Sequence, residues 1–178
     1  MLMRVFCWLT SGLLTVGATA VGTPSPSGAR ALVGSSASFF QSAVCRHLGC
    51  VSQGVRRTRL EGSSNPVRVY GYGLRAGGRV EVTRYDLKGQ SGDGRIYSLL
   101  FTQTTPRNFT RTASTAAQLA TAAAGYPVTA AQIAACWKDV TGTKSSASRL
   151  IAARGFEAPG VHCAVRGGQA QVLVILTN

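Results

Sequence analysis

Alternating apolar and polar residues are concentrated at positions 67–105, where three runs rich in valine, tyrosine and other strand-forming residues are separated by two glycine-rich segments. This pattern is typical of three antiparallel strands joined by short turns, a meander. The glycine-rich segments predict a four-residue turn at positions 75–78 and a longer turn at positions 89–94. Together these turns set the register of the predicted sheet.

The first turn places Tyr72 opposite Glu81, and the second places Val82 opposite Phe101. Because side chains alternate along a strand, this register divides the meander into two faces. The apolar face, which we expect to pack on the core, contains Val67, Val69, Val80, Val82, Leu99 and Phe101. The opposite face, here called the Tyr/Arg face, contains Arg68, Tyr70, Tyr72, Arg79, Glu81, Thr83, Tyr85, Ser98 and Thr102.

Residues 39–48 have apolar side chains at the three- and four-residue spacing of an amphipathic helix. Ser38 and Gln41 match a capping box at its start, in which the serine hydroxyl accepts a hydrogen bond from the first turn and the glutamine reaches back. Gly49 predicts the end of the helix, because glycine tolerates a left-handed backbone there. The polar and arginine-rich residues 51–66 predict a basic loop.

The sequence Thr-Ala-Ala-Gln occurs twice after the predicted strands, beginning at Thr115 and at Thr129. Both copies match a capping box, so each predicts the start of a helix. The second of these helices places four residues on one inward-facing stripe: Ile133, Cys136, Trp137 and Val140. A third, short helix is predicted at residues 146–154, before Gly155.

Residues 161–166 and 169–176 predict a β-hairpin around Gly167 and Gly168, because such a tight turn requires positive φ at both positions. The whole pattern predicts one α+β domain over residues 35–178. Its mainly antiparallel sheet has about five strands, the three-stranded meander plus the C-terminal hairpin, and three to four helices pack on it.

Residues 1–20 match a secretory signal peptide, with Arg4 as the positive charge, an apolar stretch after it and small residues at a cleavage site. The apolar stretch is short for a membrane-spanning helix, so we expect cleavage and no stable transmembrane segment afterwards. Residues 21–34 begin with a Pro-, Ser- and Gly-rich segment and predict a flexible leader. We therefore predict an exported protein of the periplasm, the cell envelope or the extracellular space.

Cleavage leaves four cysteines, an even number that predicts two disulfides in an exported chain. Of the three possible pairings we favour Cys45 with Cys50, which would tie a helix end to the segment after it, and Cys136 with Cys163. A zinc site that includes His47 is the alternative. Because an oxidising compartment favours disulfides, the sequence predicts neither a metal nor another cofactor.

The sequence has 19 Lys and Arg residues against 6 Asp and Glu residues, for a net charge of +13. A surface of this kind attracts nucleic acid, anionic wall polymer or acidic glycan at low salt. GC-rich codon usage produces the same arginine-, alanine- and glycine-rich composition, so the charge alone assigns no partner.

The Tyr/Arg face is the strongest candidate site, because aromatic rings interleaved with arginines stack on single-stranded nucleic acid or on glycans. We predict a non-enzymatic domain that binds an anionic polymer or another envelope protein. The predicted binding residues come from this face and from the basic loop: Arg68, Tyr70, Tyr72, Arg79, Tyr85, Arg56, Arg57 and Arg59.

Two other classes of function stay open. A secreted hydrolase would need a general base, for which His47 and His162 are the candidates. Cys136 is a poor candidate nucleophile, because a cysteine on an inward apolar stripe is usually structural. The third class is a structural or accessory subunit of an envelope assembly, in which a partner would cover the Tyr/Arg face.

Overall fold

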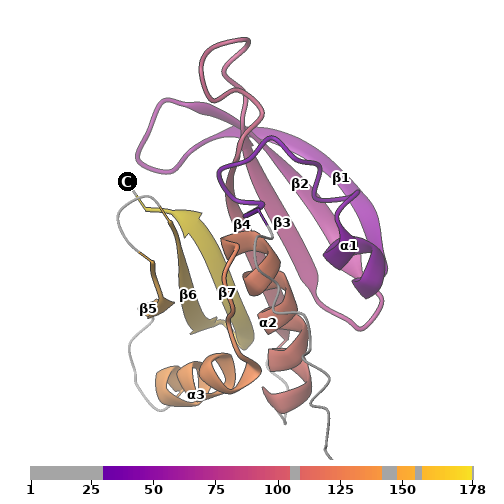
Figure 1. The fold of residues 1–178 in the computed structure, drawn as a ribbon, viewed down its shortest axis with the longest axis vertical. Helices are drawn as coiled ribbons and strands as arrows, with labels where there is room; N and C mark the ends of the chain where they lie inside the picture. Colours follow the sequence, from indigo (N-terminus) through magenta and orange to yellow (C-terminus); the bar gives the residue numbers. More distant parts are fainter. Residues whose placement is uncertain (1–29, 105–108, 142–147, 155–157, 178) are drawn as a thin grey trace, which may run out of the picture.

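The computed structural model describes residues 30–104, 109–141, 148–154 and 158–177. The predicted signal peptide and most of the predicted leader lie outside these residues. Seven strands and three helices are present in the described part (Figure 1), which confirms the α+β class. The elements are α1 (Ala43–Leu48), β1 (Cys50–Arg59), β2 (Pro66–Leu74), β3 (Arg79–Tyr85), β4 (Ile96–Thr104), α2 (Phe109–Ala124), α3 (Ala130–Thr141), β5 (Arg149–Ala152), β6 (Pro159–Arg166) and β7 (Gln169–Leu176).

All seven strands form one antiparallel sheet with the order β1-β2-β3-β4-β7-β6-β5. The C-terminal hairpin therefore joins the meander through β7, which pairs with both β4 and β6. The sequence predicted about five strands and missed the two edge strands. β1 lies within the predicted basic loop, and β5 lies where a third helix was predicted. Neither segment has a clear period-two pattern, and pairing with a neighbouring strand fixes its conformation.

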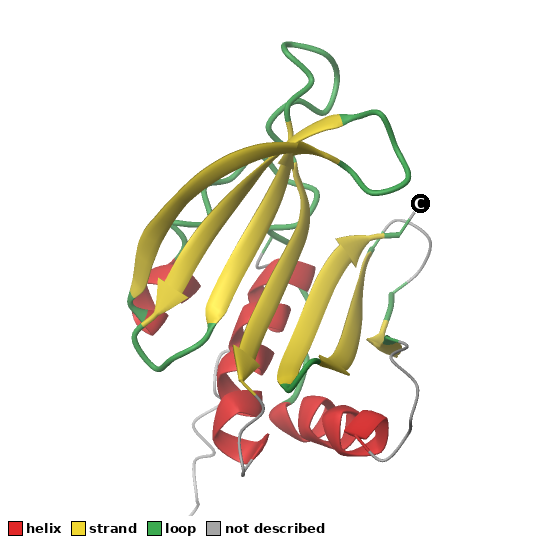
Figure 2. Cartoon of the chain, turned by 180° about the vertical axis from the view of Figure 1, so that it is seen from behind, coloured by secondary structure: helices red, strands yellow, loops and turns green. Residues whose placement is uncertain are grey.

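The helices cover one face of the sheet (Figure 1), and in the described part of the chain no helix lies on the other face (Figure 2). The buried side of α2 is mostly alanine, which allows the helix backbone to approach β4, β6 and β7 closely. Trp137 of α3 is fully buried, and its indole N–H donates to the backbone carbonyl of Gln171 at 2.9 Å. The core therefore lies between the helices and the sheet.

The start of α1 differs from the prediction. Ser42, not Ser38, is the N-cap, and its hydroxyl accepts from the amide of Cys45. Phe39 and Phe40 precede the helix, and both rings lie against Tyr72, with centroids 5.2 and 5.9 Å away. Consecutive residues of a helix point about 100° apart, so a helix beginning at position 39 would separate the two rings. The predicted end at Gly49 is confirmed by its left-handed φ of 64°.

The two Thr-Ala-Ala-Gln segments have different outcomes. α2 begins six residues before Thr115, so that threonine lies inside the helix and is not its cap. At the start of α3 the predicted capping box is present: the Gln132 amide donates to the Thr129 hydroxyl at 3.2 Å, and the Thr129 amide donates to Gln132 Oε1 at 2.8 Å. The inward stripe of α3 is confirmed as well, because all four of its predicted residues are buried.

The register between β2 and β3 is shifted by one residue from the prediction. Tyr72 lies opposite Val80 rather than Glu81. The cause is the turn, which is one residue shorter than expected: the Leu74 amide donates to the carbonyl of Gly78, and Gly77 takes the positive φ of 89° that a three-residue hairpin loop requires. A one-residue shift moves every side chain of β2 to the other face.

The register between β3 and β4 is shifted by two residues, since Val82 lies opposite Leu99 rather than Phe101. A two-residue shift keeps the faces, so Val80, Val82, Leu99 and Phe101 stay on the core side as predicted. Val67 and Val69 of β2 were predicted on that side as well, and they lie on the opposite face. The predicted tight turn at the C-terminal hairpin is confirmed by positive φ at both of its glycines.

Both favoured cysteine pairs are at disulfide distance. The Cα atoms of Cys45 and Cys50 are 5.2 Å apart, and those of Cys136 and Cys163 are 6.4 Å apart. The first bond ties the end of α1 to the start of β1, and the second ties α3 to β6. A zinc site at Cys45 is incompatible with this pairing, because the thiols that would bind the metal are bonded to each other.

Candidate functional site

The predicted Tyr/Arg face is divided between the two sides of the sheet. Arg68, Tyr70 and Tyr72 lie on the helix side, because they belong to the shifted strand β2. Tyr72 is only 7% exposed and packs against the two phenylalanines before α1, so it is a core residue. Burial raises the pKa of its phenol. Arg79 and Tyr85 of β3 lie on the open side, and the binding role of all five stays a prediction.

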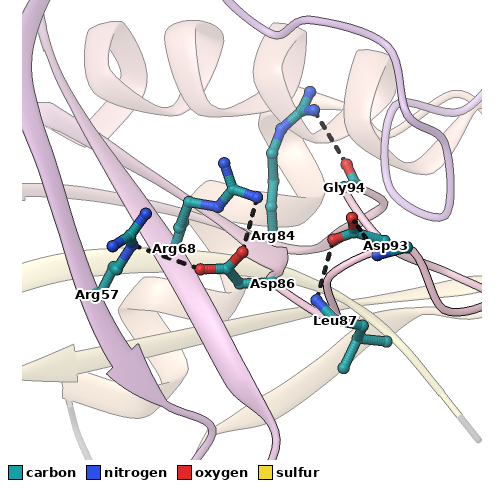
Figure 3. Close-up of polar contacts among 8 residues, drawn as sticks. Arg57, Arg68, Arg84, Asp86, Leu87, Asp93 and Gly94 are labelled. Carbon is teal, nitrogen blue, oxygen red and sulfur yellow. Dashed lines mark hydrogen bonds and ion pairs between the residues drawn. The ribbon is translucent and has the colours of Figure 1, made fainter.

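A different set of arginines lies side by side. Arg57 on β1, Arg68 on β2 and Arg84 on β3 are direct neighbours in the sheet register and share one face (Figure 3). We call these three residues the arginine row. The carboxylate of Asp86 lies between the first two, 3.5 Å from Nε of Arg57 and 2.7 Å from a terminal nitrogen of Arg68.

Arg68 is more enclosed than Arg57, since 34% of its side chain is exposed against 81% for Arg57. Burial disfavours its charged form, but Asp86 and Tyr70 outweigh this effect, so the pKa of Arg68 lies above its ordinary value. Its Nε has no hydrogen-bond partner and is shielded from solvent. Arg68 therefore stays charged at every physiological pH and is held at one end by Asp86.

Arg84 connects two loops to the sheet. Its guanidinium donates to the carbonyls of Ser36 at 3.3 Å and Gly94 at 3.0 Å, and also to the carbonyl of Ala37. The guanidinium carbon lies 6.0 Å from the centre of the Tyr70 ring. Because these carbonyls are neutral acceptors, Arg84 keeps its full positive charge while it fixes the positions of both loops.

The loop beside the row is held by Asp93, whose carboxylate accepts from the amides of Leu87 at 2.9 Å and Gly89 at 3.1 Å (Figure 3). These backbone hydrogen bonds lower the pKa of Asp93. The amide of Asp86 itself donates to the carbonyl of Pro66 at 2.9 Å. Asp86 is therefore fixed through its own amide, which bonds to Pro66, and through the amide of the next residue, Leu87, which bonds to Asp93.

The site has a surplus of positive charge. Arg59 lies two residues beyond Arg57 on the same face of β1, so this face carries four arginines against the carboxylates of Asp86 and Asp93, a surplus of two positive charges. The Arg57 side chain is 81% exposed. Exposed arginines of this kind bind phosphate, sulfate or carboxylate groups by donating two parallel hydrogen bonds to their oxygens.

The open side of the sheet has a different chemistry. Glu81 binds Arg56 at 3.2 Å and Arg79 at 3.0 Å, so the predicted cationic residues are partly neutralised there. Arg79 and Glu81 border a cavity of about 620 Å³ lined mainly by threonine and glutamine side chains from β4 and β7. Tyr85 packs edge-on against Tyr97, with ring centroids 5.3 Å apart. Around Glu81 the open side is therefore polar and nearly balanced in charge, whereas elsewhere it carries apolar side chains such as those of Val67 and Val69.

The two histidines lie far apart in the fold. His47 is exposed and lines a mostly apolar cavity of about 560 Å³ between α1 and α2. His162 lies half-buried on the open face beside Gly160, and burial lowers its pKa. Within the described residues, neither imidazole takes part in a hydrogen bond or an ion pair. The predicted general bases therefore lack the partner that would orient them.

In the described residues, no group of three or more His, Cys, Asp and Glu side chains is arranged to hold a metal ion. None of the described helices has the length and apolar character needed to span a membrane. No family model, curated protein or solved structure matches this chain.

Sequence reasoning named Arg57 and Arg68 but not Arg84 or Asp86. The signal for Arg84 was available, because it is in phase with Val80 and Val82 on a strand whose apolar side faces the core. A charged residue at such a position needs acceptors at the margin of the core. Asp86 carried no equivalent signal, since its contacts depend on the register between β2 and β3.

Proposed function

We propose that the protein is an exported, non-enzymatic domain that binds an anionic partner through the arginine row and Arg59. The observation that carries this proposal is the group of four arginines on one face of the sheet, whose charge exceeds that of the neighbouring carboxylates of Asp86 and Asp93. Candidate partners are an anionic polymer, such as nucleic acid, wall polymer or acidic glycan, and an acidic region of another envelope protein. Export is supported by the N-terminal sequence pattern and by the two cysteine pairs at disulfide distance.

A salt titration tests this proposal. Each phosphate contact with a single strand contributes a slope of roughly 0.7 to the dependence of log K on log salt concentration. Replacing both Arg57 and Arg59 with Gln should lower the slope by about 1.4 and weaken binding about 15-fold at 0.15 M salt, if each makes one contact. The measurement is fluorescence anisotropy of a labelled single-stranded oligonucleotide, with heparin as competitor.

The matched control removes the same charge elsewhere. Arg111 and Lys138 are exposed on α2 and α3, so their joint replacement by Gln lowers the net charge equally but leaves the row intact. Equal weakening by the two double variants would mean that net charge alone drives binding, which would contradict the proposal.

The hydrolase alternative has one supporting observation, the apolar cavity beside His47. A cavity of this size can hold a small acyl or ester substrate. His47→Gln should abolish any hydrolysis that takes place there. The absence of turnover of a panel of short-chain esters by the native protein would remove this alternative.

A further inference from the structure

Strand β1 has a free edge. It is ten residues long and stands at the end of the sheet, and among the described residues it pairs only with β2 (Figure 1). The opposite end of the sheet is β5, a strand of four residues with an irregular register. A long unpaired edge offers a row of backbone donors and acceptors to another extended chain.

The side chains of β1 restrict what can add to this edge. Val51 and Val55 are 67% and 58% exposed, and with Phe40 and Leu150 they are the exposed large apolar residues of the described chain. The strand carries three arginines and no carboxylate. Arginines by themselves protect an edge from unwanted pairing, but such protection does not require exposed valines.

The side chains of β1 that share one face of the sheet define the residues that a pairing strand should carry. Val55 lies opposite Tyr70 and Arg57 opposite Arg68, so Val55, Arg57 and Arg59 point to the same side. Val51 precedes the irregularity in β1 and lies opposite Gly73, on the other side. A strand added to the edge would therefore match this pattern with one apolar residue and two acidic residues at two-residue spacing.

The edge is also held in place before any partner arrives. The Cys45–Cys50 pair anchors the first residue of β1 to α1, and the turn after β1 is closed by the amide of Leu60, which donates to the carbonyl of Asn65. A strand fixed at both ends loses little conformational entropy on binding.

We propose that the β1 edge binds an extended acidic segment of another polypeptide, which adds to the sheet as a further strand. This inference rests on the proposed function and identifies the anionic partner as a protein. Two copies of β1 would bring six arginines together, because each copy has three, and neither strand contains an acidic residue to pair with those of the other. Like charges on adjacent strands repel, so a second copy of this chain is disfavoured. A nucleic acid would use neither Val55 nor the backbone of the edge.

The experiment uses the disulfide-bonded protein purified after export and two synthetic peptides. VTETETV carries the required pattern in both chain directions, and VPEPEPV has the same charge but cannot form a strand, because proline lacks the amide hydrogen. Amide hydrogen exchange should show at least tenfold slower exchange at β1 amides with the first peptide and no change with the second. Equal binding of the two peptides, or binding that leaves β1 exchange unchanged, would overturn the proposal.

Protein variants locate the contact. Val55→Ser should weaken the binding of VTETETV about two- to fivefold, whereas Val51→Ser on the other face should leave it unchanged. Replacing both Arg57 and Arg59 with Gln should weaken it at least tenfold. Slow β1 exchange that depends on protein concentration without peptide would assign the edge to a second copy and overturn the proposal.

The oligonucleotide titration separates the two proposals. If the oligonucleotide responds to the Arg57 and Arg59 replacements while VTETETV leaves β1 exchange unchanged, strand addition is wrong and anion binding stands. If neither probe responds to these replacements, both proposals are wrong.

Discussion

Replacing Tyr72 with alanine should greatly lower the free energy of unfolding of the protein. Its ring is 7% exposed and lies against Phe39 and Phe40, at 5.2 and 5.9 Å between centroids. A buried aromatic side chain removes about 150 to 250 Å² from water, which at about 25 cal/mol per Å² corresponds to roughly 4 to 6 kcal/mol. Aromatic truncations in protein cores cost about 3 to 5 kcal/mol, so we expect about 4 kcal/mol here.

Urea denaturation measures this loss. In the chain that begins after the predicted cleavage site, Trp137 is the single tryptophan, and because it is fully buried its fluorescence reports global unfolding. With a urea m-value of about 2 kcal/mol per M, the midpoint should fall by about 2 M. Tyr72→Phe keeps the ring and should stay within about 0.5 kcal/mol of the native protein. A similarly small effect of Tyr72→Ala would place the residue on the surface and refute the register between β2 and β3.

Two further predictions concern single positions. Gly125→Ala should destabilise the fold more than Gly89→Ala. Both residues have positive φ, but a Cβ at Gly125 would come within 2.9 Å of Ala31, whereas the space at Gly89 is open. Equal urea midpoints of the two variants would contradict this contact. His162 should make stability pH-dependent. Burial lowers its folded pKa, so the unfolded chain binds a proton more readily, and the contribution is present above about pH 6.5 and is lost as the pH falls. His162→Gln should flatten the fall in unfolding free energy between pH 7.5 and 5, and an unchanged slope would refute the assignment.

Local signals in the sequence predicted local structure well. The capping box at Thr129, the inward stripe of α3 and the tight turn at Gly167 each depend on residues within a few positions of one another. The helix-capping glycine at Gly49 belongs to the same group. In each case the chemistry that fixes the backbone is complete within one segment, so no knowledge of the rest of the fold is needed.

Long-range pairing set the limits of prediction. β1 and β5 are strands because they pair with β2 and β6. Their own sequences do not predict this pairing. The grouping of residues at the candidate site depended even more strongly on long-range strand pairing. A turn one residue shorter than expected moved Tyr72 into the core and brought Arg57, Arg68 and Arg84 onto one face. The predicted residue types were useful, but their grouping depended on a register that turn length decides.

The place of β7 in the sheet has a consequence for folding. It is the last described strand in the chain, yet it lies in the interior of the sheet, where Leu99 pairs with Val174 across about 75 residues of sequence. Near the other end of the described chain, the amide of Leu32 donates to the carbonyl of Ala122. Contacts of such sequence separation slow folding, because the intervening chain must be ordered first. On the proposed export route, the sheet can be completed only after β7 has crossed the membrane.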